Sequence, residues 1–200
     1  GCPRIDLVAE ELKKDSHIAL RGFFERNGGV GPKFDLQAPF LLVSQHPVTT
    51  EYEHSRRQME VTLHALHQLK MNNIMLWPNP DAGSDDISAG IRAFREKHKP
   101  HWLHLFRNLS IDDYIHLMNT TACMLGNSSS AIREGAYIGT PAVNLGSRQT
   151  NRPIGLNIVQ VPHDENAIVR AVKRQMKAGK RKMNPLYGDG LAGERVARIL

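Results

Sequence analysis

The 200-residue sequence has few cysteines, few aromatic residues and no long apolar run. Its two cysteines, Cys2 and Cys123, cannot form a disulfide framework, and Cys123 lies in an apolar run that is typical of a buried thiol. No run approaches the roughly 18 apolar residues of a membrane span. The first residues also show no basic start followed by an apolar stretch, the pattern of an export signal. We therefore expect no membrane association and a cytoplasmic location.

Charge of one sign is not concentrated on the chain either. The formal net charge is +6 and the sequence pI is about 9.5, yet Lys and Arg are scattered among Asp and Glu except in the segment 177–182. No recognised nucleic-acid motif accompanies the charge, so we expect no nucleic-acid binding. A modest positive field would equally suit a phosphorylated small molecule. With 40% hydrophobic and 23% charged residues, the chain has the composition of one globular domain.

Short apolar runs alternate with segments of helical periodicity from residue 39 onward. The runs are 39–45, 73–77, 101–106, 121–126, 141–145 and 157–161. Between the first two, Met59, Leu63 and Leu66 recur at the spacing of one helix face. Because parallel strands need crossover connections and these look helical, we predict an α/β fold with a parallel sheet and helices on both faces. Ligands of such sheets bind in the loops after the strands.

Two helix starts carry their own signal. Ser110 is followed three residues later by Asp113, and Asp164 precedes an apolar helix face in the same manner, so both resemble N-caps. Residues 1–38 fit the alternation less well, because a helix-like stretch there is followed by the breaker-rich segment GGVGPKFD. We predict a helical lead-in or linker over 1–38 and the sheet domain over 39–200.

The segment GNSSSAIREGAYIGTPAVNLGSRQ begins at Gly126 and reads as strand end, turn and helix. Ser128 or Ser129 is a natural N-cap, and the free N–H groups of a first helical turn bind anions such as a diphosphate. Glu134, about one and a half turns into the predicted helix, could reach a polyol such as ribose held over the helix start. The alternatives are that the serines only cap a helix and that Glu134 is a solvated carboxylate.

Two further loops carry candidate residues. His46 directly follows the first run, where it could donate to phosphate or act as an acid near neutral pH, although a structural histidine is an equal alternative. Arg148 and Arg152 lie in a Gly-bounded loop after the fifth run and could close over a phosphorylated ligand. Surface arginines are common, so this pair alone is weak evidence.

Histidines raise the question of a metal site: His64, His67, His98, His101 and His104. Pro100 lies between His98 and His101 and interrupts their spacing. His101 and His104 would fall on opposite faces of a strand. We therefore predict no metal ligands.

The motifs HPVTT, WPNPDAG, GNSSSAIRE and GTPAVNLGSRQ, in this order, resemble the C-terminal half of a UDP-N-acetylglucosamine 2-epimerase. The resemblance runs from GCPRIDL at the start to YGDG at residues 187–190. It implies a Rossmann-like, UDP-binding domain like the C-terminal domain of the B-type glycosyltransferase (GT-B) fold. The nucleotide sugar would lie in a cleft between this domain and an N-terminal domain of the same enzyme, which this chain does not resemble.

The resemblance also implies roles for individual residues. Ser128 and Ser129 would hold the diphosphate, Glu134 the ribose, and the backbone at Leu109 the uracil edge. His46 would contact the pyrophosphate and assist its departure, Asn79 would face the sugar, and Arg148 would contact UDP. The implied ligands are UDP and UDP-N-acetylglucosamine, the reaction uses no metal or redox cofactor, and a homo-oligomer is possible. The implied setting is amino-sugar metabolism, including sialic-acid synthesis.

The hydrolysing branch of the family matches better than the non-hydrolysing one. The latter shows arginines after the histidine and Gly-Gly after the first serine, where this chain has Pro47 and Ser129-Ser130. The resemblance therefore favours release of UDP and N-acetylmannosamine, through a glycal intermediate. One departure is Ser130-Ala131, where hydrolysing enzymes often have a cysteine or small residue followed by glycine. The alternatives are a non-hydrolysing epimerase, the donor-binding domain of a GT-B glycosyltransferase, and a non-enzymatic UDP-binding module.

Overall fold

A computed structural model describes residues 1–200. Its centre is a six-stranded sheet in which every neighbouring pair is parallel and the order is β3-β2-β1-β4-β5-β6. The strands are β1 (Phe40–Ser44), β2 (Asn72–Leu76), β3 (Leu103–Phe106), β4 (Cys123–Gly126), β5 (Ala142–Leu145) and β6 (Ile158–Val161). Each overlaps one predicted run, which confirms the α/β fold and the parallel sheet.

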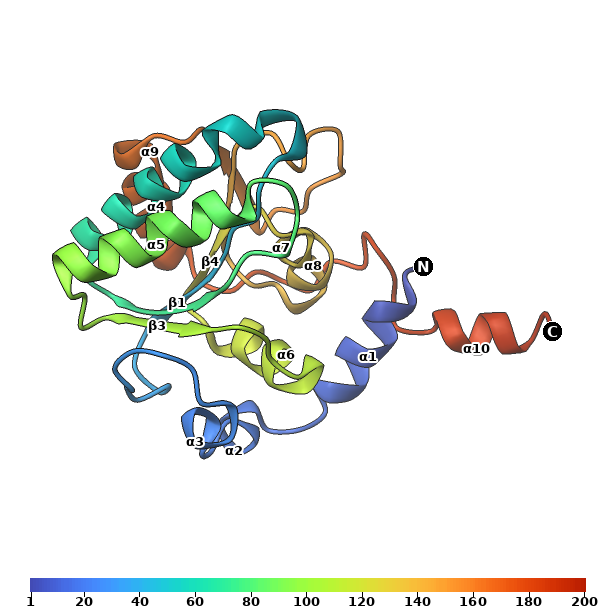
Figure 1. The fold of residues 1–200 in the computed structure, drawn as a ribbon. Coiled ribbons are helices and arrows are strands. Elements are labelled where there is room, and N and C mark those ends of the chain that lie inside the picture. Colours follow the sequence, from blue (N-terminus) through green and yellow to red (C-terminus); the bar gives the residue numbers. More distant parts are fainter.

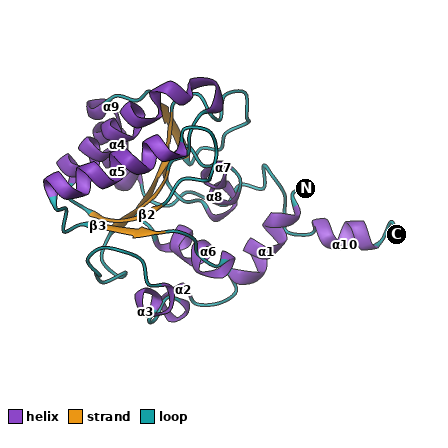
Figure 2. Ribbon diagram, viewed as in Figure 1, coloured by secondary structure: helices purple, strands orange, loops and turns teal.

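Helices cover both faces of the sheet (Figures 1 and 2). They are α1 (Pro3–Glu11), α2 (Ser16–Ala19), α3 (Phe23–Asn27), α4 (Ser55–Leu69), α5 (Ser84–His98), α6 (Ile111–Thr120), α7 (Ser129–Ile132), α8 (Glu134–Ile138), α9 (Glu165–Ala178) and α10 (Ala192–Ala197), with the 3-10 helix η1 (Thr49–His54) before α4. Helices α4, α5 and α9 lie on one face, and α1, α6, α7 and α8 lie on the other. The predicted two-sided covering is confirmed.

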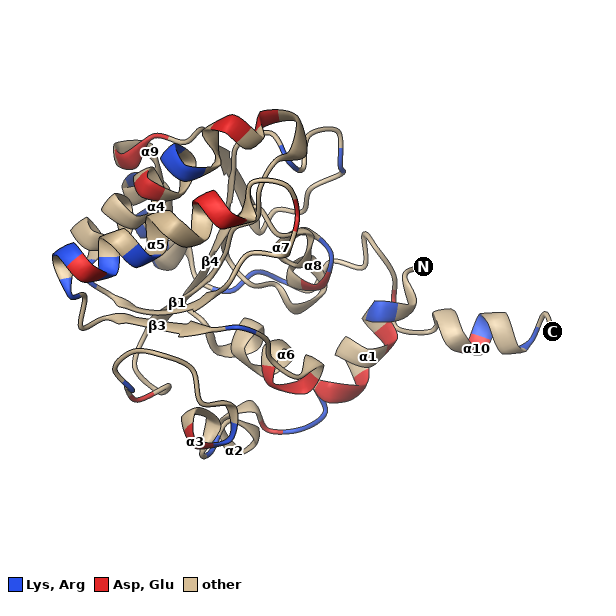
Figure 3. Ribbon diagram, viewed as in Figure 1, with Lys and Arg blue, Asp and Glu red and all other residues tan.

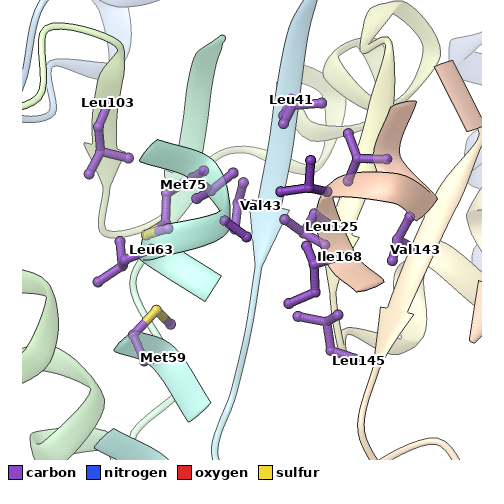
Figure 4. Close-up of a cluster of buried hydrophobic side chains, with 14 of the residues drawn as sticks. Leu41, Val43, Met59, Leu63, Met75, Leu103, Leu125, Val143, Leu145 and Ile168 are labelled. Atoms are coloured by element: carbon purple, nitrogen blue, oxygen red, sulfur yellow. The ribbon is translucent and has the colours of Figure 1, made fainter. Parts of the chain in front are cut away.

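The sheet separates two apolar cores because successive side chains of a strand point to opposite faces. Leu41 and Val43 of β1 belong to the core under α4, α5 and α9, where Leu63 and Ile168 pack against the strands (Figure 4). The alternate β1 residues, Phe40 and Leu42, belong to the core on the other face. β1 is buried along its whole length, which explains its continuous apolar run.

Both predicted helix caps are present. The Ser110 Oγ accepts a hydrogen bond of 3.1 Å from the Asp113 N–H, and the Asp164 Oδ1 accepts one of 2.7 Å from the Ala167 N–H. Each satisfies one of the free donors of a helix start. Lys and Arg alternate with Asp and Glu along the helices (Figure 3).

The first 38 residues pack onto the second core. Val8, Leu20, Phe23 and Phe24 are buried there, and Val30 forms an antiparallel bridge with Leu105 of β3. The helical content expected for this segment is present, while a domain boundary at residue 38 stays a prediction.

Helix α10 begins against α1 and extends away from the rest of the molecule (Figure 1). The Asp6 carboxylate accepts hydrogen bonds from the N–H groups of Ala192 (3.1 Å) and Gly193 (2.6 Å). None of the helices combines the length and apolar character that crossing a membrane requires.

Candidate functional site at the carboxyl edge of the sheet

The carboxyl ends of β1 and β4 lie side by side where the strand order reverses. Ser44 is in register with Gly126, whose φ is 138°, and a Cβ at Gly126 would overlap the Ser44 carbonyl oxygen. Only glycine allows this close approach. In doubly wound sheets the crevice at such a reversal is where ligands bind. The loops that carry His46 and Ser128 both begin here.

Asn127 joins the two loops. Its side chain is fully buried, its Oδ1 accepts from the His46 N–H (2.7 Å), and its Nδ2 donates to the His46 carbonyl (2.8 Å). Its own carbonyl accepts from the Gln149 side chain (2.7 Å) and from Arg148 Nη1 (3.4 Å). One amide therefore ties together the loops after β1, β4 and β5.

The His46 ring has both nitrogens engaged. The Asn79 N–H donates to Nδ1 (3.1 Å), and Nε2 lies 3.1 Å from Ser44 Oγ. A backbone N–H can only donate, so the hydrogen-bond network assigns Nδ1 as an acceptor and places the proton of the neutral ring on Nε2. Burial, and then the positive charge of Arg148, lower the pKa of His46 from 6.5 to about 4.

This corrects the expectation that His46 acts as an acid near neutral pH. At pH 7 the ring is neutral, because desolvation of the imidazolium outweighs the nearby charge of Asp81. His46 can still donate a hydrogen bond as a neutral group.

Asn79 and Arg148 lie beside this histidine. Asn79 is exposed and contacts His46 through its backbone. The Arg148 Nη2 lies 3.9 Å from Asp81 Oδ2, and its side chain is 27% exposed, so the guanidinium keeps donors free. Arg152, in contrast, is exposed and forms no ion pair.

The serine motif departs from the predicted single helix. Ser128 is the N-cap, as expected, and its Oγ accepts from the Ser130 N–H at 3.4 Å. However, α7 has only 4 residues, and the chain breaks at Arg133 (φ −87°, ψ −71°) before α8. A helix dipole therefore contributes little here, because few peptide units are aligned. The hydroxyls and the N–H groups of the first turn remain as donors.

Glu134 is the first residue of α8, and its side chain is only 4% exposed. Its Oε1 lies 3.3 Å from Arg4 Nε of α1 and 3.6 Å from Arg133 Nη2. Its Oε2 is buried without a hydrogen-bond partner. Glu134 is thus not a solvated carboxylate, and an unpartnered buried carboxylate oxygen is costly unless a donor reaches it.

Leu109 follows β3 and is partly buried against the second core. Its N–H donates to the Asn108 side-chain oxygen at 3.0 Å. A ligand that used this N–H would therefore have to displace Asn108.

A cleft of about 460 Å³ lies beside His46. Its lining is Pro47, Val48, Thr49, Thr50, Glu51, Asp81, Ser147, Arg148 and Thr150. A larger cavity of about 550 Å³ lies between the end of α5 and the start of β3 and contains none of the motif residues. We assign the site to the smaller cleft because the loops after β1, β2 and β5 all border it, as expected for a parallel sheet. Arg148 is the one predicted site residue in its lining, and the serines and Glu134 lie outside it.

The histidines of α4 and α5 form an aromatic cluster instead of a cation site. The His98 ring lies 5.0 Å from that of His67 and 5.9 Å from that of His64, and it stacks on Phe94 at 4.4 Å. No group of three or more His, Cys, Asp or Glu side chains is arranged to hold a metal ion.

Most predicted residues converge, and three contributors were missed. His46, Asn79, Arg148 and the serines surround one edge of the sheet, while Leu109 and Glu134 flank it. Sequence reasoning did not assign Asn127, Ser130 or Tyr114. Asn127 stands inside the quoted motif, which was a usable signal. Tyr114 carried no signal of its own in the sequence, and its hydroxyl lies 2.7 Å from Ser130 Oγ.

Comparison with known proteins agrees with this geometry. The UDP-N-acetylglucosamine 2-epimerase family matches residues 6–200. A UDP-N,N'-diacetylbacillosamine 2-epimerase (hydrolyzing) of Legionella pneumophila is 29% identical over the whole chain, which spans 50% of that protein. A UDP-N-acetylglucosamine 2-epimerase of Neisseria meningitidis is 27% identical over 78% of the chain and 41% of its own length.

The fold is also shared with solved structures. A Methanocaldococcus jannaschii UDP-GlcNAc 2-epimerase, crystallised with UDP-GlcNAc and UDP, superposes with a TM-score of 0.71 at 17% identity. The superposition includes 100% of this chain and 53% of the Methanocaldococcus chain. This coverage confirms the likeness to one domain of a GT-B-type fold. The chain spans about half the length of the relatives it matches. With a family match over nearly its entire length, the chain belongs to the UDP-N-acetylglucosamine 2-epimerase family.

Proposed function

We propose that this chain is the nucleotide-binding half of a UDP-N-acetylglucosamine 2-epimerase, with UDP-N-acetylglucosamine as the substrate of the whole protein. An N-terminal domain would complete the cleft, since the relatives are about twice as long as the chain. We further propose hydrolysis to N-acetylmannosamine and UDP. Pro47 after His46, together with Ser129-Ser130, supports this outcome, as does the hydrolysing activity named for the Legionella relative.

The observation that carries the proposal is the meeting of four loops at the switch point of the sheet. Asn127 binds both His46 and Arg148, and His46 binds Asn79, so the loops after four strands are joined at one edge of the sheet, where Arg148 lines the cleft. Hydroxyl, amide and guanidinium donors grouped in this way suit a diphosphate. The orphaned Glu134 Oε2 suits the hydroxyls of a ribose.

In this proposal each predicted residue keeps a role. Ser128 and Ser129 hold the diphosphate, and Arg148 contacts UDP. Glu134 receives the ribose after the half-exposed Arg4 moves aside. The backbone at Leu109 receives the uracil edge, and Asn79 faces the sugar.

His46 would contact the pyrophosphate as a neutral donor and assist UDP departure once its Nε2 proton turns from Ser44 Oγ to a phosphate oxygen. Its low pKa argues against a charged contact at neutral pH. A cytoplasmic location is supported by the two free thiols, Cys2 and Cys123. Sialic-acid synthesis is the pathway that the resemblance favours.

Thermal unfolding with ligands tests the proposal. UDP at about 100 times its Kd should stabilise the chain by about 2.7 kcal/mol. For a chain of this size that corresponds to a rise in Tm of about 5 to 10 °C. Uridine at the same concentration should give a smaller rise, because it lacks the diphosphate. Equal protection by UDP and uridine would count against the roles of Ser128 and Ser129.

A further inference from the structure

A hydroxyl chain runs behind the serine motif. The Tyr114 hydroxyl, from α6, lies 2.7 Å from Ser130 Oγ, and Ser130 Oγ lies 2.9 Å from Ser128 Oγ. Tyr114 therefore links α6 to the serines after β4.

The direction of this hydroxyl chain is set by the phenol. Ser130 Oγ is the one hydrogen-bond partner of the Tyr114 hydroxyl, so the phenol donates its single proton to Ser130 Oγ. Ser130 in turn donates to Ser128 Oγ. Each hydroxyl can donate only one proton, so the proton of Ser128 is left for an acceptor outside the chain.

The phenol is held in its donating form. Burial, and after it the negative charge of Glu134, raise the pKa of Tyr114 above its ordinary value. Successive hydrogen bonds in such a chain also polarise and strengthen one another.

We propose that Tyr114 is a positioning residue that fixes the Ser128 hydroxyl as a hydrogen-bond donor toward a bound phosphate. The inference deepens the proposed function and rests on it. Without the phenol, Ser130 loses its donor, and Ser128 can then turn its proton inward to Ser130 Oγ. A phosphorylated ligand would then meet a lone pair of Ser128 Oγ instead of the Ser128 hydroxyl proton.

Calorimetric titration of the 200-residue chain with UDP and uridine tests this role. Tyr114→Phe should weaken UDP binding about tenfold, as for one lost charge-assisted hydrogen bond. Uridine affinity should change less than about twofold, because the substitution affects only the phosphate contact. Tyr137→Phe is the matched control: this tyrosine packs against the same core and makes no side-chain hydrogen bond, so both affinities should remain.

Ser130→Ala provides an independent variant, since it removes the hydroxyl that connects Tyr114 to Ser128. It should reproduce the loss for UDP, and the double variant should lose no more than either single one, because the residues act as one unit. An unchanged UDP-to-uridine affinity ratio in Tyr114→Phe would overturn the role of Tyr114. If that variant does not fold, the ratio in Ser130→Ala decides. Failure of the unmodified chain to prefer UDP over uridine would instead overturn the proposed function itself.

Discussion

Both ring nitrogens of His46 are engaged within the loop cluster, and this determines which form of the residue is present. At neutral pH the ring is uncharged, with its proton on Nε2, so His46 is a directional link between the Asn79 backbone and Ser44. The same burial makes the folded state sensitive to acid.

The pH dependence of stability follows with a definite sign. The pKa of His46 is about 4 in the folded chain, below its ordinary 6.5. The unfolded chain therefore binds the proton more tightly, and the stabilising contribution is complete above pH 6.5 and is lost as the pH falls toward 4. At pH 5 the free energy of unfolding has fallen by about 2 kcal/mol through this group.

Urea unfolding of the chain and of His46→Gln, at pH 7.5 and at pH 5, measures this contribution. The unmodified chain should lose about 2 kcal/mol more than the variant between the two conditions. His98 and His163 also have lowered pKa values. Their contribution to the pH dependence of stability is the same in both proteins, so the difference between the proteins belongs to His46. An identical pH dependence of the two proteins would contradict the prediction.

The buried Glu134 carboxylate, with one oxygen lacking a partner, leads to a second prediction at the residue scale. Glu134→Gln should weaken UDP binding by roughly 1 to 2 kcal/mol, because a charge-assisted hydrogen bond to ribose becomes a neutral one. Folding should change little, since the pairing residue Arg4 is half exposed. Calorimetry with UDP and 2′-deoxy-UDP provides the measurement, with Glu194→Gln on the exposed face of α10 as the control. If the variant discriminates the two nucleotides as well as the original chain does, Glu134 does not bind the ribose.

At the scale of elements, α1 to α3 are attached to the sheet domain by both apolar and polar contacts. Phe23 is 1% exposed, and its ring lies 5.1 Å from that of Phe106 at the end of β3. The buried His116 of α6 joins Glu11 and Ser16, at 2.9 Å each. A segment held in this way contributes to the core of the domain.

Replacing Phe23 tests whether the segment acts as a lead-in or as part of the domain. Phe23→Ala should lower the free energy of unfolding by about 3 kcal/mol or more, through lost burial and the cavity left behind. Ile18→Ala, at a position 60% exposed on α2, should cost little. Denaturant unfolding of both variants gives the values. Similar small losses would show that residues 1–38 behave as a linker.

At the scale of the whole molecule, the chain spans about half the length of the relatives it matches, so in the proposed function it supplies one side of the cleft. The loops offer donors for a nucleotide, but His46 is neutral and fully hydrogen-bonded, so it is not free to act as a base. Inversion at the sugar C2, the reaction we propose for the whole protein, requires removal of a proton on one face and its return on the other. An open site also leaves the sugar in water.

We therefore predict that the chain alone binds UDP but does not turn over UDP-N-acetylglucosamine. Incubation of the purified chain with UDP-N-acetylglucosamine, followed by assay of UDP and N-acetylmannosamine, should show background levels only. Sustained release of both products, abolished in His46→Ala, would show that the chain contains a catalytic base that is not apparent in its loops.

The sequence by itself determined the elements of this protein and the identity of its motifs. Six apolar runs predicted six strands, and the caps at Ser110 and Asp164 predicted two helix starts, because these features depend on hydrogen bonds and side-chain periodicity within a few residues. The motif GNSSSAIRE pointed to Ser128 and Glu134 on the same local basis. The break at Arg133 escaped prediction, since no breaker residue marks it.

Only the tertiary structure decided how these parts meet. The strand order that places β1 beside β4, the clamp of Asn127 on His46, and the contact of Tyr114 with Ser130 join residues distant in the chain. The pKa of His46 belongs to the same class, because burial and a neighbouring arginine lower it and both arise only on folding. Local patterns reveal which groups the chain carries, whereas their protonation and the direction of their hydrogen bonds depend on partners that long-range packing supplies.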